Sequence, residues 1–393
     1  MKKHTKAAAI LLFGMVLAAA IYLGVYQSQQ PQSQAQSSSS AVESAAPSDS
    51  VPSKTQSTSE SKAKTRIITD QAGRTLELPA EIKAVYSVSP IGTMLMYTFD
   101  DKMVAGLNVV LSNEEKAYLT EYYQNLPLLG GWYGKGNQGN VEEIMKSAPD
   151  IIFSSGTDQT SVDTAKQFQQ QMGIPVILVK SDLVDLADTY RFLGKLFNKE
   201  ARGEALAAYT EETVRHAKEI AGRIPDAERI RVYYAEEQDG LHTDPSGSSH
   251  SQLIDLCGGI NVADCDITPG YGRTAVSIEQ VMSWDPQLII CGTDKGYVNS
   301  GSYNTVLNDG KWSEIKAVKD KLVFQTPFQP QNWFDRPPSV NTIIGIKWIQ
   351  SLLYPQHVDY NIREETKKFY KLFYHIELSD KDVDIITEHA LRD

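Results

Sequence analysis

The sequence contains few cysteines. Among its 393 residues there are three, Cys257, Cys265 and Cys291, and none of them forms a CxxC pair or a zinc-binding spacing. Cys257 and Cys265 are close enough in sequence for a small-loop disulfide, but three ordinary buried thiols fit the sequence equally well. Because a lipoprotein needs a cysteine directly after its signal and the first cysteine here is Cys257, we expect no lipid anchor of the lipoprotein type.

An excess of basic residues and the usual catalytic motifs are also missing. Lys and Arg number 38 against 49 Asp and Glu, so the net charge of -11 argues against a nucleic-acid partner. No GxSxG, HExxH, Walker A or GxGxxG motif follows an expected strand. His242, Asp244 and Ser246 lie too close together on one loop to form a catalytic triad. We therefore expect no enzyme and no cofactor.

The N-terminal residues 1–26 combine Lys2, Lys3 and Lys6 with an uncharged apolar run, Ala7–Tyr26. A cleaved signal has an apolar core of ~7–15 residues, whereas a membrane span needs ~20. The length of the run favours an uncleaved membrane anchor over a cleaved signal peptide. In either case the positive flank predicts that the rest of the chain is extracytoplasmic.

Residues 27–65 are rich in Ser, Gln, Pro and Ala and contain no aromatic residue. Such a segment cannot bury enough apolar surface to offset its conformational entropy, so we predict a disordered linker. The remaining chain is long enough for two domains.

A repeated phrase organises those two domains. Residues 142–152 read EEIMKSAPDII and residues 279–289 read EQVMSWDPQLI. Each phrase predicts a short helix, a proline and a buried strand of the parallel type, followed by small residues. Ligands of α/β sheets bind beyond the carboxyl ends of the strands. We predict two similar α/β lobes that each contribute a wall to one ligand site.

A helical segment separates the two repeats. Asp185–Phe197 predicts one helix and Lys199–Arg223 a longer one, which would join the lobes stiffly. The predicted organisation is an N-terminal ligand-binding lobe at 66–184, a helical linker at 185–225 and a C-terminal ligand-binding lobe at 226–393.

Five segments, in order, resemble one family. They are Arg66–Pro79, Asn140–Ile152, Gly258–Val262, Val276–Ile290 and Asn332–Tyr354. Together they resemble the iron-siderophore, haem and cobalamin substrate-binding proteins of ABC importers. The resemblance covers about 66–393 and implies two Rossmann-like lobes joined by a single long helix, the class III periplasmic-binding-protein fold. It implies capture of an iron chelate or corrinoid and delivery to a permease dimer with its ATPase. We expect a monomer.

The resemblance also implies a docking role for Glu142 and Glu279, which match the family's glutamates on the two lobe tips. Carboxylates at equivalent points of a two-lobed protein suit arginines on a twofold permease. The alternative is that both are ordinary exposed glutamates at helix N-termini. The sequence departs from the family where Thr93-Met94 follows Ser89-Pro90, since the family often has Thr-Glu after its Ser-Pro.

Candidate ligand-binding residues come from loops that follow the expected strands. A large planar or carboxylate-bearing chelate would be held by aromatic faces and arginine side chains. The alternative for the aromatic residues is packing in the lobe core. The candidates are Ser89, Trp132, Tyr133 and Lys135 in the N-terminal lobe, and Tyr271, Arg273, Trp333 and Arg336 in the C-terminal lobe.

Direct metal ligation has weaker support. His242 and His250 lie eight residues apart in a turn-rich segment, and Tyr297 and Tyr303 lie in a Gly-rich loop. These spacings fix no metal geometry. A site lined by His or Tyr without aromatic platforms would favour an importer subunit for a free metal ion or a molybdate-type oxyanion. A third hypothesis is a membrane-anchored sensor or surface scaffold that meets no permease.

Overall fold

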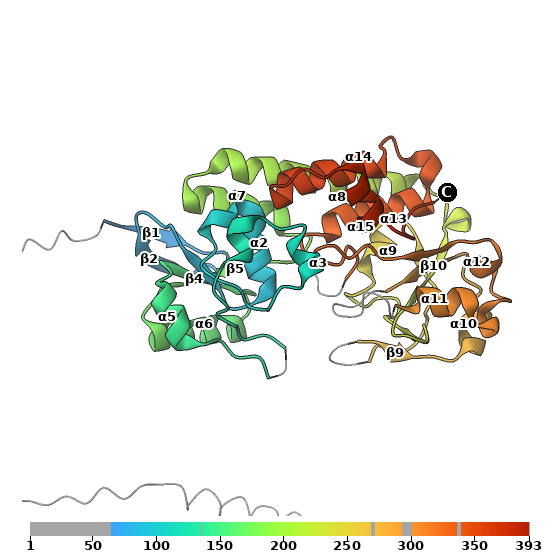
Figure 1. Ribbon diagram of the computed structural model, residues 1–393, viewed down its shortest axis with the longest axis horizontal. Helices are drawn as coiled ribbons and strands as arrows, with labels where there is room; N and C mark the ends of the chain where they lie inside the picture. The colour runs from blue at the N-terminus through green and yellow to red at the C-terminus, as the bar shows by residue number, and fades with distance from the viewer. Residues whose placement is uncertain (1–63, 135, 269–271, 293–300, 336–338, 393) are drawn as a thin grey trace, which may run out of the picture. The chain divides into compact units, whose positions relative to one another are not determined.

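A computed structural model describes residues 64–134, 136–268, 272–292, 301–335 and 339–392 (Figure 1). Residues 61–393 form one compact unit. The expected signal or anchor at 1–26 and nearly all of the expected linker lie outside the described residues. In the described part of the chain, no helix is both long and apolar enough to cross a membrane.

The N-terminal lobe is built on a parallel sheet of order β3-β4-β5: Val85–Ser87, Ile151–Ser155 and Val176–Val179. Alternate residues of these strands enter separate cores on the two faces. Phe153 and Ile177 belong to one core, and Ile152 and Leu178 to the other. Burial on both faces explains the continuous apolar runs in the sequence. An antiparallel pair, β1 (Thr65–Thr69) and β2 (Thr75–Pro79), precedes this sheet in the chain.

The C-terminal lobe contains a second parallel sheet, of order β11-β10-β6-β8. Its strands are Val323–Gln325, Leu288–Cys291, Arg231–Ala235 and Ile260–Asn261. Strand β7 (His242–Thr243) comes after β6 in the chain and pairs antiparallel with β9 (Thr274–Ala275). The three cysteines are free thiols, so the possible Cys257–Cys265 disulfide is not formed.

The repeated phrase forms the same structure twice. Helices α5 (Val141–Ser147) and α10 (Ile278–Trp284) each bury the third residue of the phrase, Ile144 or Val281, completely. Each ends at a left-handed residue before the proline, Ala148 with φ 46° or Asp285 with φ 43°, and leads into β4 or β10. The prediction of two similar lobes is confirmed.

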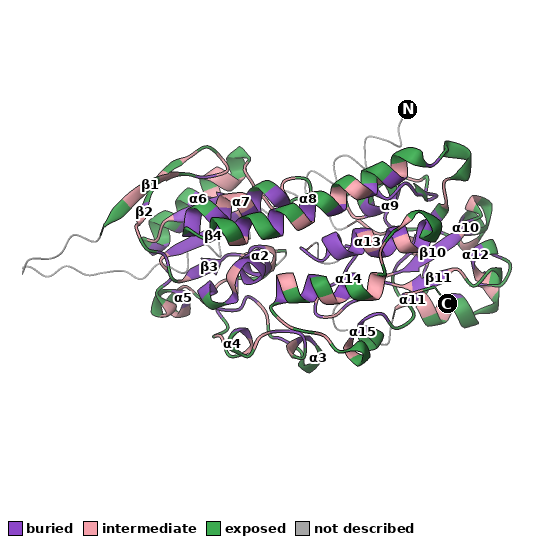
Figure 2. Ribbon diagram, turned by 90° about the horizontal axis from the view of Figure 1, so that it is seen from above, coloured by how far each residue is buried: buried purple, intermediate pink, exposed green. Residues whose placement is uncertain are grey.

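Helices α7 (Leu186–Phe197) and α8 (Glu200–Arg223) form the predicted linker, within one residue of the expected bounds. They pack closely because two glycines meet at their contact. A Cβ on Gly203 would lie 2.5 Å from the Tyr190 carbonyl oxygen and 2.9 Å from the Cα of Gly194. One core of buried side chains includes Phe153 of the N-terminal lobe, Leu206 of α8 and Ile290 of the C-terminal lobe, and Figure 2 shows the buried stripe along α8. The linker is therefore part of the core.

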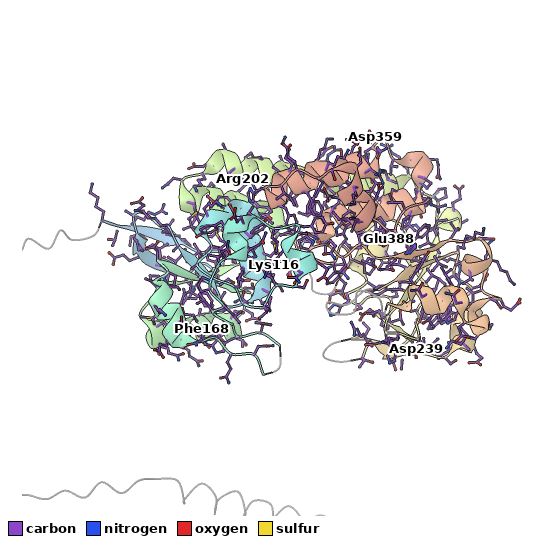
Figure 3. The ribbon with its side chains drawn as sticks, in the orientation of Figure 1. Lys116, Phe168, Arg202, Asp239, Asp359 and Glu388 are labelled. Atoms are coloured by element: carbon purple, nitrogen blue, oxygen red, sulfur yellow. The ribbon has the colours of Figure 1, made fainter. Side chains whose placement is uncertain are left out.

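The C-terminal helices cover this joint. Helix α13 (Thr342–Leu353) is followed by α14 (Ile362–Phe369), a π-helical turn η5 (Tyr370–Tyr374) and α15 (Asp380–Ile386). Tyr97 of the N-terminal lobe donates to the Tyr374 carbonyl at 2.8 Å. Arg202 of α8, labelled in Figure 3, donates to the carbonyls of Thr98 and Leu372 at 2.5 and 2.7 Å. These bonds tie η5 to the N-terminal lobe and to α8.

The other helices are short or flank the sheets. They are α2 (Pro90–Asp100), η1 (Asp101–Met103), α3 (Asn113–Lys116), α4 (Glu121–Gln124), α6 (Gln159–Met172), η2 (Asp226–Glu228), α9 (Gln252–Leu256), α11 (Ser302–Asn308), η3 (Gly310–Trp312), α12 (Lys316–Lys319) and η4 (Pro355–His357).

Candidate ligand-binding site

The N-terminal lobe presents hydroxyl groups and the start of a helix at the carboxyl ends of β3 and β4. Ser89 caps α2, and its Oγ accepts from the Gly92 N–H at 3.5 Å. A Cβ on Gly92 would lie 2.3 Å from Ser87 Oγ and 3.9 Å from Ser155 Oγ, so the first turn of α2 lies against both serines. Ser155 Oγ is buried and has no hydrogen-bond partner among the described residues. Such a helix start, with hydroxyls beside it, favours negatively charged ligands.

The loop with Trp132 and Tyr133 lies next to these hydroxyls. Trp132 donates its backbone N–H to the Val88 carbonyl at 2.8 Å. Its half-buried ring packs at 4.7 Å from the ring of Phe168, which Figure 3 labels, and against Gly139. Tyr133 donates its hydroxyl to the Asn108 carbonyl at 3.3 Å, and burial raises its pKa. Much of the Trp132 ring is therefore used in packing within the lobe. Lys135 lies outside the described residues.

The C-terminal lobe presents charged groups. Arg273 has a left-handed backbone, with φ 63°, and contacts Glu236 at 3.1 Å and Glu237 at 2.5 Å through its guanidinium. Its backbone N–H donates to Asp244 Oδ1 at 3.4 Å. Glu236 is 2% exposed, so its carboxylate fixes the guanidinium from inside the lobe. This wall combines a positioned arginine with several carboxylates.

The side chains of Asp244, His250 and Asp335 lie close together in the C-terminal lobe. His250 Nδ1 lies 2.6 Å from Asp335 Oδ1, and one ligand atom from each of Asp244, His250 and Asp335 lies within 4.8 Å of the others. Asp244 is 0% and Asp335 3% exposed. His242 is placed elsewhere, on β7 at 3.7 Å from Asp239, which is labelled in Figure 3. Asp244 and Asp335 were not predicted as partners of His250. Asp335 lies 85 positions away, so no local spacing links it to His250, and without Asp335 the nearby Asp244 forms no recognisable metal motif with the histidine.

Trp333 does not face a ligand, contrary to the expectation that its ring stacks on one. It is 0% exposed, and its Nε1–H donates to the Tyr370 hydroxyl at 3.4 Å. Phe334 is also buried, with its ring 4.4 Å from that of Tyr234. The pair occupies the core beneath α13, because two adjacent aromatic side chains bury more apolar surface there than they could at a solvated loop.

Tyr303 lies beside the C-terminal segment. Its ring stacks on His389 at 4.7 Å, and it lines an open cavity of about 840 Å³ together with Phe324 and Arg392. The Asp244, His250 and Asp335 group takes no part in that cavity. The remaining candidates, Tyr271, Tyr297 and Arg336, lie outside the described residues.

A narrow cavity of about 30 Å³ joins the start of α2 to the segment before α13. Pro90, Ile91 and Thr93 line one side, and Gln331 and Ser339 line the other. Thr93 donates to Asn108 Oδ1 at 2.5 Å, and the Asn108 amide donates to the carbonyls of Ser87 and Gly130. The volume is about that of one water molecule, so the two lobes meet closely at this point.

Glu142 and Glu279 occupy equivalent exposed positions in the first turns of α5 and α10. Hydrogen bonds from its own backbone N–H and from Ser277 lower the pKa of Glu279. One turn further along each helix, Met145 is 46% and Met282 39% exposed. Each lobe therefore shows a carboxylate and an apolar side chain on the same helix.

Comparison with known proteins places the chain in a family. The model of the periplasmic binding protein family matches residues 97–330, so the chain belongs to that family. A solute-binding protein of an ABC transporter from Sulfurospirillum deleyianum has a similar structure, with 35% identity, a TM-score of 0.72 and coverage of 82% of this chain and 98% of that one.

Two curated relatives carry named ligands. The molybdate-binding protein of Haemophilus influenzae is 27% identical over 338 residues, which is 79% of this chain and 91% of that protein. The vitamin B12-binding protein of Yersinia pestis is 27% identical over 232 residues, which is 58% of this chain and 76% of that protein.

Family membership fixes the general activity. The chain is the substrate-binding protein of an ABC importer; it acts outside the cytoplasm and is not an enzyme. The resemblance inferred from the sequence is confirmed at this level. Because the relatives bind chemically different ligands, the family does not name the ligand of this chain.

Proposed function

We propose that the chain captures a compact oxyanion of the molybdate type and delivers it to a permease. The observation that carries the proposal is the buried Ser155 hydroxyl beside the first turn of α2. A hydroxyl donor and the positive end of a helix of 11 residues are suited to a small, multiply charged oxygen ligand. Its C-terminal counterpart is the positioned guanidinium of Arg273.

A large planar chelate fits the described residues less well. An iron chelate or a corrinoid, the first choice from the sequence, needs aromatic faces for stacking. Trp333 is fully buried, and the ring of Trp132 packs on Phe168 and Gly139. The molybdate-binding relative also matches a larger share of this chain than the B12-binding relative does. We therefore place the oxyanion first.

Delivery depends on Glu142 and Glu279 as permease-docking residues. Their equivalent positions on two similar lobes suit a permease dimer with its ATPase. Exposed carboxylates give register through charge-assisted bonds to arginine. In this proposal the protein works as a monomer held at the membrane by its N-terminal segment.

The ligand is tested by isothermal titration of the unit from Ser61 onward with molybdate, tungstate, sulfate, ferric siderophores, haem, cobalamin and nickel-histidine. Molybdate and tungstate should bind at one site, and the chelates should give no heat. Tight binding of haem, a siderophore or cobalamin with no response to molybdate would contradict the oxyanion proposal. It would restore the chelate hypothesis.

Docking is tested by uptake of the ligand in cells that carry Glu142→Ala together with Glu279→Ala. Uptake should fall at least 10-fold while ligand affinity in solution stays unchanged. Glu143→Ala is the matched control, since Glu143 lies on the same helix and pairs with Lys146. Full uptake by the double variant would exclude the docking role and favour the sensor or scaffold hypothesis.

A further inference from the structure

The side chains of Asp244, His250 and Asp335 come from two loops of the C-terminal lobe. Asp244 follows β7, His250 precedes α9, and Asp335 lies between β11 and α13. Their ligand atoms lie within 4.8 Å of one another, and His250 Nδ1 lies 2.6 Å from Asp335 Oδ1. Two nearly inaccessible carboxylates and an imidazole at one point form a set of metal-ligating groups.

A network of hydrogen bonds around the three side chains holds them in place. Ser248 Oγ donates to Asp244 Oδ1 at 3.2 Å and accepts from the His250 backbone N–H at 3.2 Å. The Arg273 backbone N–H also donates to Asp244. On the Asp335 side, Asn332 Oδ1 accepts from the backbone N–H of Asp335 at 3.0 Å. Metal ligands are commonly oriented by such outer hydrogen bonds, which here fix the conformation of both loops before any ion binds.

We propose that Asp244, His250 and Asp335 bind one divalent transition-metal ion. With metal–ligand bonds of ~2.1 Å, ligand atoms in a tetrahedral site lie about 3.4 Å apart. The cluster therefore needs the His250–Asp335 pair to open by less than 1 Å. The ion takes the place of the proton between the imidazole and the carboxylate, and that proton leaves to solvent. An imidazole with two carboxylates favours Zn²⁺, Co²⁺ or Ni²⁺ over Ca²⁺ and Mg²⁺.

The ion would change the charge of this wall of the candidate site. Asp244, Asp335, Glu236 and Glu237 are all carboxylates, and Arg273 binds the last two through its side chain. A bound divalent ion would add positive charge to this wall. If the oxyanion proposal holds, on which this step rests, the bound ion strengthens oxyanion binding, because charges in a poorly hydrated cleft interact strongly.

The metal site is tested on protein without a histidine tag, after treatment with a chelator and its removal. Titration with Zn²⁺ should show one equivalent bound, and Zn²⁺ should raise the midpoint of thermal unfolding. Co²⁺ should give a visible d–d absorption of a bound ion. Mg²⁺ should do neither.

The variants His250→Asn and Asp335→Asn should weaken Zn²⁺ binding at least 10-fold, since each removes one ligand but keeps a polar side chain of similar size. His242→Asn is the matched control, because His242 lies in the same turn-rich segment but beside Asp239. It should bind Zn²⁺ like the unchanged protein. Unfolding midpoints without metal verify that each variant is folded.

Two results would overturn the metal site: no Zn²⁺ binding by the unchanged protein, or equal binding by His250→Asn and His242→Asn. Molybdate titrations with and without Zn²⁺ separate this inference from the proposed function. Zn²⁺ binding without any molybdate binding supports the metal site and contradicts the oxyanion proposal. Molybdate binding by protein that takes up no Zn²⁺ supports the oxyanion proposal and contradicts the metal site.

Discussion

Replacing Gly345 with alanine tests whether the loop that carries Asp335 is held in place by close packing against α13. A Cβ at Gly345 would lie 1.8 Å from the backbone oxygen of Trp333 and 2.9 Å from its carbonyl carbon. A carbon and a carbonyl oxygen normally stay at least about 3.3 Å apart. The loop or the helix must therefore move by about 1.5 Å.

This movement costs free energy because Trp333 is tightly packed and cannot shift easily. Its side chain is 0% exposed, and its Nε1–H is bonded to Tyr370. Overpacking of this kind costs about 1–3 kcal/mol, while alanine gains about 0.5–1 kcal/mol over glycine inside a helix. The difference between the two effects is centred near 1 kcal/mol, so we expect Gly345→Ala to lower the free energy of unfolding by about 1 kcal/mol. The Zn²⁺ affinity should fall as well, since Asp335 lies two residues from Trp333.

The assay is urea unfolding followed by tryptophan fluorescence, with Gly222→Ala as the matched control. Gly222 lies in the last turn of α8, and a Cβ there would meet nothing within 4 Å. The control should therefore gain about 0.5 kcal/mol. If both variants are equally stable, the loop is not packed as described, and the reasoning that places Asp335 beside His250 fails with it.

Two further predictions concern charge and hydrogen bonding. Burial raises the pKa of Glu365, but hydrogen bonds and charges from Lys368 and Lys347 outweigh burial and lower it. Its contribution to stability should thus be present above about pH 4.3 and lost as pH falls below it. Glu365→Gln should lower the free energy of unfolding by on the order of 3 kcal/mol at neutral pH. In urea unfolding, the variant's stability should also fall less steeply with pH below about 4.3. An equally steep fall in both proteins would contradict this. Ser155→Ala should leave the unfolding midpoint unchanged, because Ser155 Oγ has no hydrogen-bond partner in the described part of the chain, and weaken molybdate binding about 5- to 10-fold by calorimetry. Unchanged affinity would remove Ser155 from the site.

The fold could be predicted where local patterns set it. Each copy of the repeated phrase contains its helix, its proline and its doubly buried strand, so α5-β4 and α10-β10 follow from the residues themselves. The C-terminal layer after α13 could not be predicted in this way. Tyr370 and Phe373 lie in a π-helical turn, and their rings pack against those of Tyr118 and Tyr190, more than 180 residues earlier.

The residues of the candidate site also differ in how far local sequence predicts their positions. The position of Ser89 follows from the sequence, because a serine before a proline is typical of a helix start, and Ser89 caps α2; its part in ligand binding stays a prediction. Trp333 was misplaced because an aromatic residue in a loop has the same sequence signature whether it packs inward or faces a ligand. The group of Asp244, His250 and Asp335 depends on how two loops far apart in the sequence meet, and no local pattern encodes that meeting.

The two lobes share a scaffold but present different chemistry to the candidate site. After β4 the N-terminal lobe places the Ser155 hydroxyl beside the start of α2. After β10 the C-terminal lobe has Gly292, where a Cβ would lie 3.1 Å from the Tyr234 hydroxyl and 3.4 Å from Glu236. A side chain there would crowd Tyr234 and Glu236, so the charged groups at this edge come from the neighbouring loops. Because neutral donors on one wall face ionised groups on the other, ligand charge would be selected mainly by the C-terminal lobe. A bound metal ion would alter that wall alone.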